Sequence, residues 1–247
     1  MKNIVIILLI FSTLQACNQF DKNGKSTARV ETIKDKVQTI DSANARKNEF
    51  SIPQNTNKAQ PDDKTRAALM AYNAGVQYYQ KKDLENALAQ FKIVLEKTPD
   101  YSPASHYLGR IYYDKGQKEL SLSYYEDAVR NNINDSVSIL GIGQVHFDMG
   151  NYVKAMEYYN MSVDIAPNYA LAYYNRGTLL GMQNKYIEAL DDLNKSIDLD
   201  SSNGNAYVNR GLAYFYLKQM NSACRDWQKA SDLGIEKAKD ALDEYCR

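Results

Sequence analysis

The residue types that usually carry enzymatic chemistry are few in this sequence. It has two histidines, His106 and His146, and they fall at different helical phases, which argues against one shared metal site. The chain contains a 34-residue repeat, described below, and His146 takes a position where the other repeats hold Tyr or Leu. A packing role is therefore the favoured interpretation of His146. No glycine-rich phosphate loop, HExxH or GxSxG motif occurs. Asp191 and Asp192 are interpreted as solvent-facing rather than catalytic. We therefore predict no catalytic, cofactor or metal site, and no enzyme.

Composition is that of an ordinary soluble protein. The 247 residues are 24% charged and 44% hydrophobic, with a formal net charge of zero. No excess of either charge indicates a nucleic-acid or cationic partner. All 20 tyrosines follow residue 71, so the first quarter of the chain is not expected to join the core.

The N-terminus is expected to be an export signal. A short positive start precedes the apolar run Ile4–Phe11, which is too short for the roughly 20 residues that span a bilayer. This predicts a signal peptide over residues 1–16. Leu14-Gln-Ala-Cys17 resembles the bacterial lipoprotein signal, which implies lipid attachment at Cys17 and anchoring by acyl chains. Asn18, where Asp would retain the protein in the inner membrane, favours the outer membrane and leaves the membrane face open. The alternative is an ordinary secretory signal that happens to contain Cys17.

Residues 17–66 are expected to form a flexible tether. This stretch is rich in Lys, Asn, Asp, Gln, Ser and Thr, with too few apolar residues to offset its ordering entropy. Val30, Ile33, Val37 and Ile40 recur at helical spacing, so a partner-binding amphipathic helix is the alternative there.

The rest of the chain repeats every 34 residues. The repeated glycines are Gly75, Gly109, Gly143, Gly177 and Gly211. Twelve residues after each comes a second small residue, in the order Ala87, Ser121, Ala155, Ala189 and Ala223. Four residues further stands a large one, in the order Phe91, Tyr125, Tyr159, Leu193 and Trp227.

This period, with small residues at those two places, resembles the tetratricopeptide repeat family. The resemblance covers residues 67–237, as repeats 68–101, 102–135, 136–169, 170–203 and 204–237. It implies an all-α, right-handed superhelical solenoid of five helix pairs, with a concave groove lined by the first helix of each pair. Residues 235–247 are expected to add a capping helix, because Glu236–Tyr245 has one apolar and one charged face.

Local signals place several helix ends. Helices are expected near Ala68–Lys81 and Leu84–Lys97, with Asp83 capping the second. Turns inside the later pairs are expected at Gly116, Gly150-Asn151, Asn184 and Asn221.

Two cysteines near the end of the chain are expected to pair. Cys224 lies ten residues before Gly234 and Cys246 twelve after it, so they are about level in a helix pair that turns there. An exported protein meets an oxidising compartment, which favours a disulfide. The alternative is two unrelated thiols.

Candidate peptide-binding residues follow from the resemblance. The sixth repeat position, expected to face the groove, holds Asn73, Tyr107, Gly141, Asn175 and Asn209. In some family members asparagines there hold an extended peptide, since an amide side chain both donates and accepts. The full candidate set is Asn73, His106, Tyr107, Arg110, Gln144, Tyr174, Asn175 and Asn209.

Three features of the sequence bear on whether the groove binds a peptide. Asn175 and Asn209 also fit a plain helix consensus, Tyr-x-Asn-Arg-Gly, which is the alternative. The basic clamp that some members use for a C-terminal carboxylate is absent, although Arg110 can hold one acidic side chain. If the groove is open at Gly141, replacement by Ala should stabilise the third repeat, because a mid-helix glycine costs about 1 kcal/mol relative to alanine; a loss of stability would mean that another backbone packs there.

Together these resemblances imply a lipid-anchored scaffold of the bacterial cell envelope. It is expected to bind a peptide segment of another protein in its groove, with no nucleic acid or small-molecule substrate. The alternative is a structural subunit of an outer-membrane assembly, which needs a large apolar patch outside the groove.

Overall fold

The computed structural model describes residues 62–246 of the chain. The expected signal peptide, Cys17 and most of the expected tether lie outside the described residues. Within residues 62–246 every regular element is a helix, which confirms the all-α fold class. The helices are α3 (Asp63–Gln80), α4 (Leu84–Lys97), α5 (Ser102–Asp114), α6 (Lys118–Asn131), α7 (Ser136–Asp148), α8 (Tyr152–Ile165), α9 (Ala170–Met182), α10 (Tyr186–Leu199), α11 (Gly204–Tyr216), α12 (Met220–Asp232) and α13 (Glu236–Tyr245).

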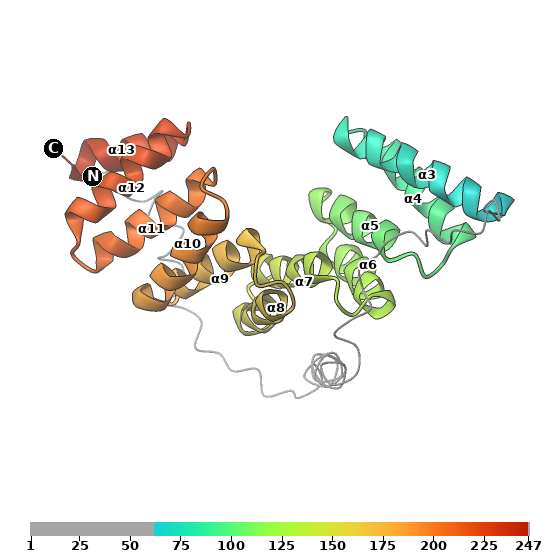
Figure 1. Cartoon of the computed structure of the whole chain (residues 1–247), viewed down its shortest axis with the longest axis horizontal. Coiled ribbons are helices and arrows are strands. Elements are labelled where there is room, and N and C mark those ends of the chain that lie inside the picture. Colours follow the sequence, from blue (N-terminus) through green and yellow to red (C-terminus); the bar gives the residue numbers. More distant parts are fainter. Residues whose placement is uncertain (1–61, 247) are drawn as a thin grey trace, which may run out of the picture. The chain divides into compact units, whose positions relative to one another are not determined.

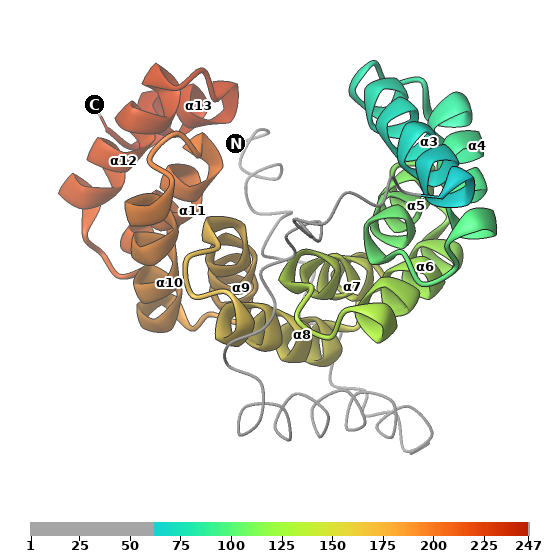
Figure 2. The same cartoon turned by 45° about the vertical axis from the view of Figure 1, so that its right-hand side comes forward.

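The described chain divides into two compact units. The N-terminal unit (residues 62–151) holds α3 to α7, and the C-terminal unit (residues 152–246) holds α8 to α13. In the first, α3 packs on α4 and α5 packs on α6. In the second, α9 packs on α10, α11 on α12, and α13 on α12 (Figures 1 and 2).

Side-chain caps fix where several helices begin. The Asp62 carboxylate accepts from the Thr65 backbone N–H at 2.6 Å, so α3 begins at Asp63, earlier than the expected Ala68. Residues 63–66 therefore belong to a helix rather than to the tether. Asp83 accepts from the Asn86 N–H at 3.2 Å, and α4 begins at Leu84 as expected. The last helix, Glu236–Tyr245, also has its predicted bounds.

The turns inside the helix pairs recur with the period of the sequence. Backbone φ is positive at Lys82, Gly116, Gly150, Asn184 and Lys218. The expected turns at Gly116, Gly150 and Asn184 are confirmed. The turn predicted at Asn221, in the fifth repeat, is wrong: Asn221 lies inside α12, and the turn falls at Lys218. Lys218 N–H donates to Phe215 C=O at 2.9 Å and Gln219 N–H to Tyr214 C=O at 2.8 Å, which closes the end of α11 and outweighs the strain of a left-handed Lys.

The repeated glycines make room for the large residue sixteen positions later. A Cβ added to Gly109 would lie 2.7 Å from the Tyr125 ring, and one on Gly211 would lie 2.6 Å from the Trp227 indole. At both of these positions the nearest atoms are those of an aromatic side chain, whereas at Gly177 they belong to Asp192 and Leu193, at 3.0 Å. The second small residue of each repeat is fully buried, as the close packing of helices requires.

A disulfide joins the end of the chain to the helix before it. Cys224 in α12 and Cys246 after α13 are bonded, with their Cα atoms 5.8 Å apart. The bond fixes α13 against α12 at the end of the C-terminal unit. None of the described helices is both long and apolar enough to cross a membrane.

Candidate functional site

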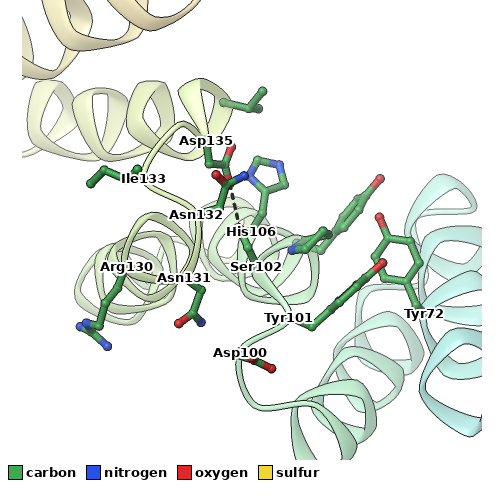
Figure 3. A pocket seen from close by; sticks show the side chains of 13 residues that line it. Tyr72, Asp100, Tyr101, Ser102, His106, Arg130, Asn131, Asn132, Ile133 and Asp135 are labelled. Carbon is green, nitrogen blue, oxygen red and sulfur yellow. Dashed lines mark hydrogen bonds between the residues drawn. The ribbon is translucent and has the colours of Figure 1, made fainter. Parts of the chain in front are cut away.

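The N-terminal unit contains a cleft of about 630 Å³ between α3, α5 and the junction of α6 with α7. Figure 3 shows Tyr72 on α3, Tyr101 before α5, and Asn132 and Asp135 from the junction around it. The lining residues are Tyr72, Asp100, Tyr101, Ser102, Pro103, His106, Tyr107, Arg130, Asn131, Asn132, Ile133, Asp135 and Val137. Two of the predicted groove residues, His106 and Tyr107, are among them.

One side of the cleft is aromatic. The Tyr72 ring meets the Tyr101 ring edge-on at 5.3 Å and the Tyr107 ring at 6.0 Å between centroids. Tyr107 in turn stacks on Phe91 at 4.7 Å, so the rings are held by the core below them. Burial, together with the neighbouring hydroxyls of Tyr107 and Tyr101, raises the pKa of Tyr72 to about 12. Its hydroxyl therefore remains a hydrogen-bond donor at neutral pH.

The other side of the cleft is a satisfied polar network. Asp135 caps α7, since its Oδ1 accepts from the Ser138 N–H at 3.0 Å. Its Oδ2 accepts from the Ser138 hydroxyl at 2.6 Å and lies 3.3 Å from the Ser102 hydroxyl. These bonds compensate the charge of Asp135 and fix the junction in place.

His106 connects this network to the cleft. Its Nδ1 lies 2.9 Å from the Ser138 hydroxyl oxygen. Because that hydroxyl gives its single proton to Asp135, the imidazole Nδ1 must donate, which leaves Nε2 as an acceptor. Burial lowers the pKa of His106 and Arg110 acts in the same direction, while Asp135 opposes them. The ring is therefore neutral at pH 7.

The Asp–Ser–His set is not arranged for nucleophilic catalysis. In a catalytic triad the imidazole stands between the hydroxyl and the carboxylate. Here the hydroxyl of Ser138 stands between the other two, and Ser138 is fully buried. Its oxygen is out of reach of a substrate, and its role is to orient His106. Across residues 62–246, no cluster of three or more His, Cys, Asp or Glu residues forms a metal site.

The remaining predicted groove residues of this unit have local partners or face solvent. Asn73 is exposed on α3. Arg110 Nε donates to Asp114 Oδ1 at 3.4 Å, and Gln144 Nε2 donates to Asp148 Oδ1 at 3.2 Å. A partner's acidic group would compete with Asp114 for Arg110.

Gly141 is not in open space, so the condition under which Ala would stabilise the repeat is not met. A Cβ at this position would lie 2.6 Å from Cζ of Tyr125. Tyr125 is buried against α7, and its pKa is raised mainly by that burial. The glycine is needed because a tyrosine ring fills the space over α7.

The predicted residues Tyr174, Asn175 and Asn209 belong to the C-terminal unit. Tyr174 and Asn175 are half-buried, whereas Asn209 is buried. The Asn209 amide Nδ2 donates to the Thr178 hydroxyl at 2.9 Å, joining α11 to α9. The expectation that Asn209 is an exposed groove residue is therefore wrong, because its side chain holds two helices together.

Two ion pairs in the C-terminal unit were missed by the sequence analysis. Arg176 donates to both carboxylate oxygens of Asp192, at 2.8 and 2.7 Å, and Arg210 to both of Asp226, at 2.7 Å each. The interpretation of Asp192 as a surface residue is wrong, since it is buried beside Arg176.

Each arginine of these pairs makes a third hydrogen bond, to an asparagine, and its guanidinium lies over a tyrosine ring. Arg176 Nη1 reaches Asn160 at 3.1 Å, and Arg210 Nη1 reaches Asn194 at 2.8 Å. Their guanidinium carbons lie 5.6 and 5.4 Å from the ring centres of the tyrosines three residues earlier. The sequence did carry a signal, because Tyr-x-x-Arg-Gly recurs with an Asp sixteen residues after each Arg.

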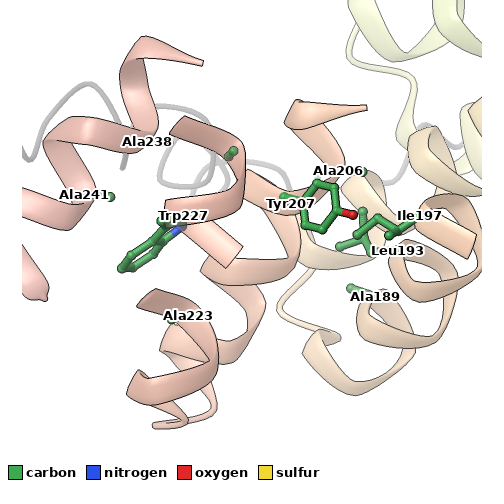
Figure 4. Packing of buried hydrophobic residues seen from close by; sticks show 10 residues of the cluster. Ala189, Leu193, Ile197, Ala206, Tyr207, Ala223, Trp227, Ala238 and Ala241 are labelled. Atoms are coloured by element: carbon green, nitrogen blue, oxygen red, sulfur yellow. The ribbon is translucent and has the colours of Figure 1, made fainter. Parts of the chain in front are cut away.

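A small-residue core lies next to the second pair. Figure 4 shows Trp227 and Tyr207 among Ala206, Ala223, Ala238 and Ala241. These alanines let α11, α12 and α13 approach closely. Arg210 and Asp226 lie at the edge of the cluster, where each satisfies the hydrogen bonds of the other.

Comparison with known proteins assigns the chain to a repeat family. Sequence models described as tetratricopeptide repeat match residues 72–136 and 135–202, which together are just over half of the chain. With the helix pairs and their period, this shows that the chain belongs to the tetratricopeptide repeat family. No curated protein sequence matches it.

Several solved structures share the fold at low sequence identity. One is the crystal structure of MamA, 22% identical, covering 71% of this chain and 96% of its own, with a TM-score of 0.56. Another is YrrB, titled a TPR protein with an unusual peptide-binding site, 22% identical over 74% of this chain and 98% of its own, with a TM-score of 0.56. PilF of Pseudomonas aeruginosa is 17% identical over 73% of this chain and 86% of its own, with a TM-score of 0.64. At these identities the likeness concerns the fold.

Proposed function

We propose that the chain is a protein–protein interaction scaffold that binds a peptide segment of a partner in the cleft of the N-terminal unit. The observation that carries this proposal is the cleft itself, about 630 Å³ with one aromatic side and one polar side. Such sites suit peptides because apolar walls provide contact area and a few fixed polar groups set orientation. Membership of the repeat family and the peptide-binding site named for YrrB support the proposal.

The chemistry of the cleft suits an extended backbone. Tyr72 offers a protonated hydroxyl as donor, and His106 offers Nε2 as acceptor. Asn131 adds an amide that can do both. The rings of Tyr101 and Tyr107 supply flat apolar surface for side chains on either side of the bonded peptide unit.

Site-specific photo-crosslinking in the native cell tests the cleft. A crosslinking residue in place of Val137, which lines the cleft, should capture a defined partner peptide. The matched control replaces Leu120, an exposed apolar residue of the same unit outside the cleft. Capture at Val137 that is abolished by Tyr101→Ala supports the proposal. Capture at Leu120 alone contradicts it and favours the alternative, a structural subunit of an envelope assembly.

We further propose that the scaffold is anchored to the bacterial cell envelope through acylated Cys17, with the outer membrane favoured. The apolar run before Cys17 supports this, and so does the Cys224–Cys246 disulfide, since disulfides persist in oxidising compartments. Cys17→Ala should abolish labelling by fatty acid and processing at that site. Equal labelling of the variant would refute lipid attachment there.

A further inference from the structure

One edge of the C-terminal unit carries exposed apolar side chains. Val153 is 75% exposed, Ile187 66% and Met220 37%. They stand at the first or second residue of α8, α10 and α12, so all three lie where the second helix of a pair begins. Val153 and Ile187 hold the same repeat position, which puts them on the same edge. We call residues 152–153, 183–187 and 217–221 the turn edge.

The pieces of the turn edge lie next to one another. The ring of Tyr186, at the start of α10, stacks on that of Tyr216, at the end of α11, at 4.8 Å and 8° between planes. This contact brings the turn with Ile187 beside the turn with Met220. One repeat earlier the equivalent positions are Tyr152, next to Val153, and Met182, before the α9–α10 turn. Partly exposed tyrosines therefore stand between the exposed aliphatic side chains.

The charge of the turn edge is positive. Lys185 and Lys218 are exposed in its two turns, and none of its residues is Asp or Glu. The equivalent turns of the N-terminal unit, residues 81–85 and 115–119, carry both charges: four lysines stand there beside Asp83, Glu85 and Glu119. There Lys115 pairs with Glu85.

We propose that the turn edge contacts an anionic lipid surface. Val153, Ile187 and Met220 would enter the boundary between headgroups and acyl chains, the tyrosines would lie at headgroup level, and Lys185 and Lys218 would meet lipid phosphates. Aliphatic tips flanked by tyrosine and lysine are typical of membrane interfaces. The side chains project from successive turns, and a fluid bilayer can cover them without a complementary hollow. This contact is independent of the cleft and of the acyl chain.

Vesicle binding by the mature chain carrying Cys17→Ser tests the proposal, because that variant has no acyl chain to mask the contact. It should sediment with vesicles of phosphatidylethanolamine and phosphatidylglycerol, and much less with phosphatidylcholine alone. Val153→Ser combined with Ile187→Ser should lower the partition coefficient at least about tenfold. Lys185→Ala combined with Lys218→Ala should lower it by roughly twenty-fivefold, at about fivefold for each lysine.

The matched control is Leu171→Ser, which removes a 41% exposed apolar side chain of the same unit outside the turn edge. It should leave partitioning unchanged, and circular dichroism should show that every variant is folded. No vesicle binding by the Cys17→Ser chain, or equal losses in the control, would overturn the proposal. The Cys17→Ser chain could instead self-associate and fail to bind vesicles. If Val153→Ser with Ile187→Ser then abolished the self-association, a second copy of the chain would be the occupant of the turn edge. Partner capture at Val137 should be unaffected throughout, which separates this test from that of the cleft.

Discussion

The two units share one repeat but fill its equivalent positions with different chemistry. Where the C-terminal unit has Arg176 and Arg210, the N-terminal unit has Leu108, fully buried in an apolar cluster. The C-terminal unit also ends in a disulfide. The repeat thus fixes the helix packing and leaves open whether a buried position is met by apolar contact or by a compensated ion pair.

The polar surfaces differ in the same way. The N-terminal unit has charged turns and a cleft whose aromatic and neutral polar groups are held by a hydrogen-bond network. The C-terminal unit has apolar and basic turns, and its predicted groove residue Asn209 is used for packing. On this difference rest our two proposals, peptide binding for the first unit and lipid contact for the second.

Removing one half-buried arginine should have the largest effect on stability. Arg210→Ala leaves Asp226 buried without its partner and should destabilise the C-terminal unit by about 3 kcal/mol. Hydrogen exchange read by mass spectrometry, segment by segment, measures each unit separately. The control is Arg110→Ala in the N-terminal unit, whose side chain is 52% exposed against 19% for Arg210. It should cost less than about 1 kcal/mol. Equal costs would remove the distinction between the two ion-pair types.

Opening the disulfide should come next. The chain-entropy estimate for a loop with a sequence separation of 22 is roughly 3 kcal/mol. Cys224→Ser with Cys246→Ser should therefore raise exchange in α12 and α13, because α13 is then held only by its small apolar face. Exchange in α3 to α7 should stay the same. Faster exchange across both units would show that the bond stabilises more than the C-terminal end.

Gly141→Ala should destabilise the N-terminal unit by about 1–2 kcal/mol. The methyl group collides with the Tyr125 ring, and the overpacking cost exceeds the gain in helix propensity of about 1 kcal/mol. Thermal unfolding of the single variant and of Gly141→Ala with Tyr125→Leu forms a test, since the smaller side chain should relieve most of the added cost. A stabilised single variant would restore the view that this position is open.

The sequence predicted the helices well because their signals are local and periodic. Asp83 caps α4 through its own side chain, and Gly116 and Gly150 supply positive φ directly. Lys218 was missed because lysine rarely adopts that backbone. The period alone would have identified it, since it lies 34 residues after the turn at Asn184.

The candidate site was predicted only in part, because it depends on side chains from different segments. His106 and Tyr107 follow from their helix positions. Tyr101, Asn132 and Asp135 lie in junctions between repeats, where no helical phase indicates what they face. The space above Gly141 depends on the direction of the Tyr125 ring, which spacing does not give.

Asn209→Ala should cost the C-terminal unit about 1 kcal/mol through the lost bond to Thr178. Asn73→Ala, at the same repeat position but exposed in the N-terminal unit, should change stability by less than about 0.5 kcal/mol. Denaturant titration of both variants compares them directly. A cost for Asn73→Ala equal to that for Asn209→Ala would mean that both asparagines pack alike.

The last expected effect is a pH dependence confined to the N-terminal unit. The pKa of His106 lies below its ordinary value of 6.5, chiefly because the ring is buried. Between 6.5 and the lowered folded value, the unfolded chain binds a proton that the folded chain does not. Stability is therefore fully present above pH 6.5 and falls as the pH drops through this window, by at most about 1.4 kcal/mol per pH unit. The carboxyls with lowered pKa, Asp62, Glu96 and Asp200, titrate below their ordinary values of 3.8 to 4.5, outside the window.

His106→Asn tests this assignment, because the asparagine amide nitrogen takes about the place of Nδ1 and can still donate to the Ser138 hydroxyl but does not titrate. Between pH 6.5 and about 5, where histidine is the ordinary titrating side chain, exchange in α5, which holds no histidine other than His106, should rise in the wild type and stay level in the variant. The C-terminal unit, whose described residues include no histidine, should stay level in both. A wild-type response of equal size in the two units would show that some other group carries the pH dependence, and the neutral, donating His106 on which the cleft depends would have to be given up.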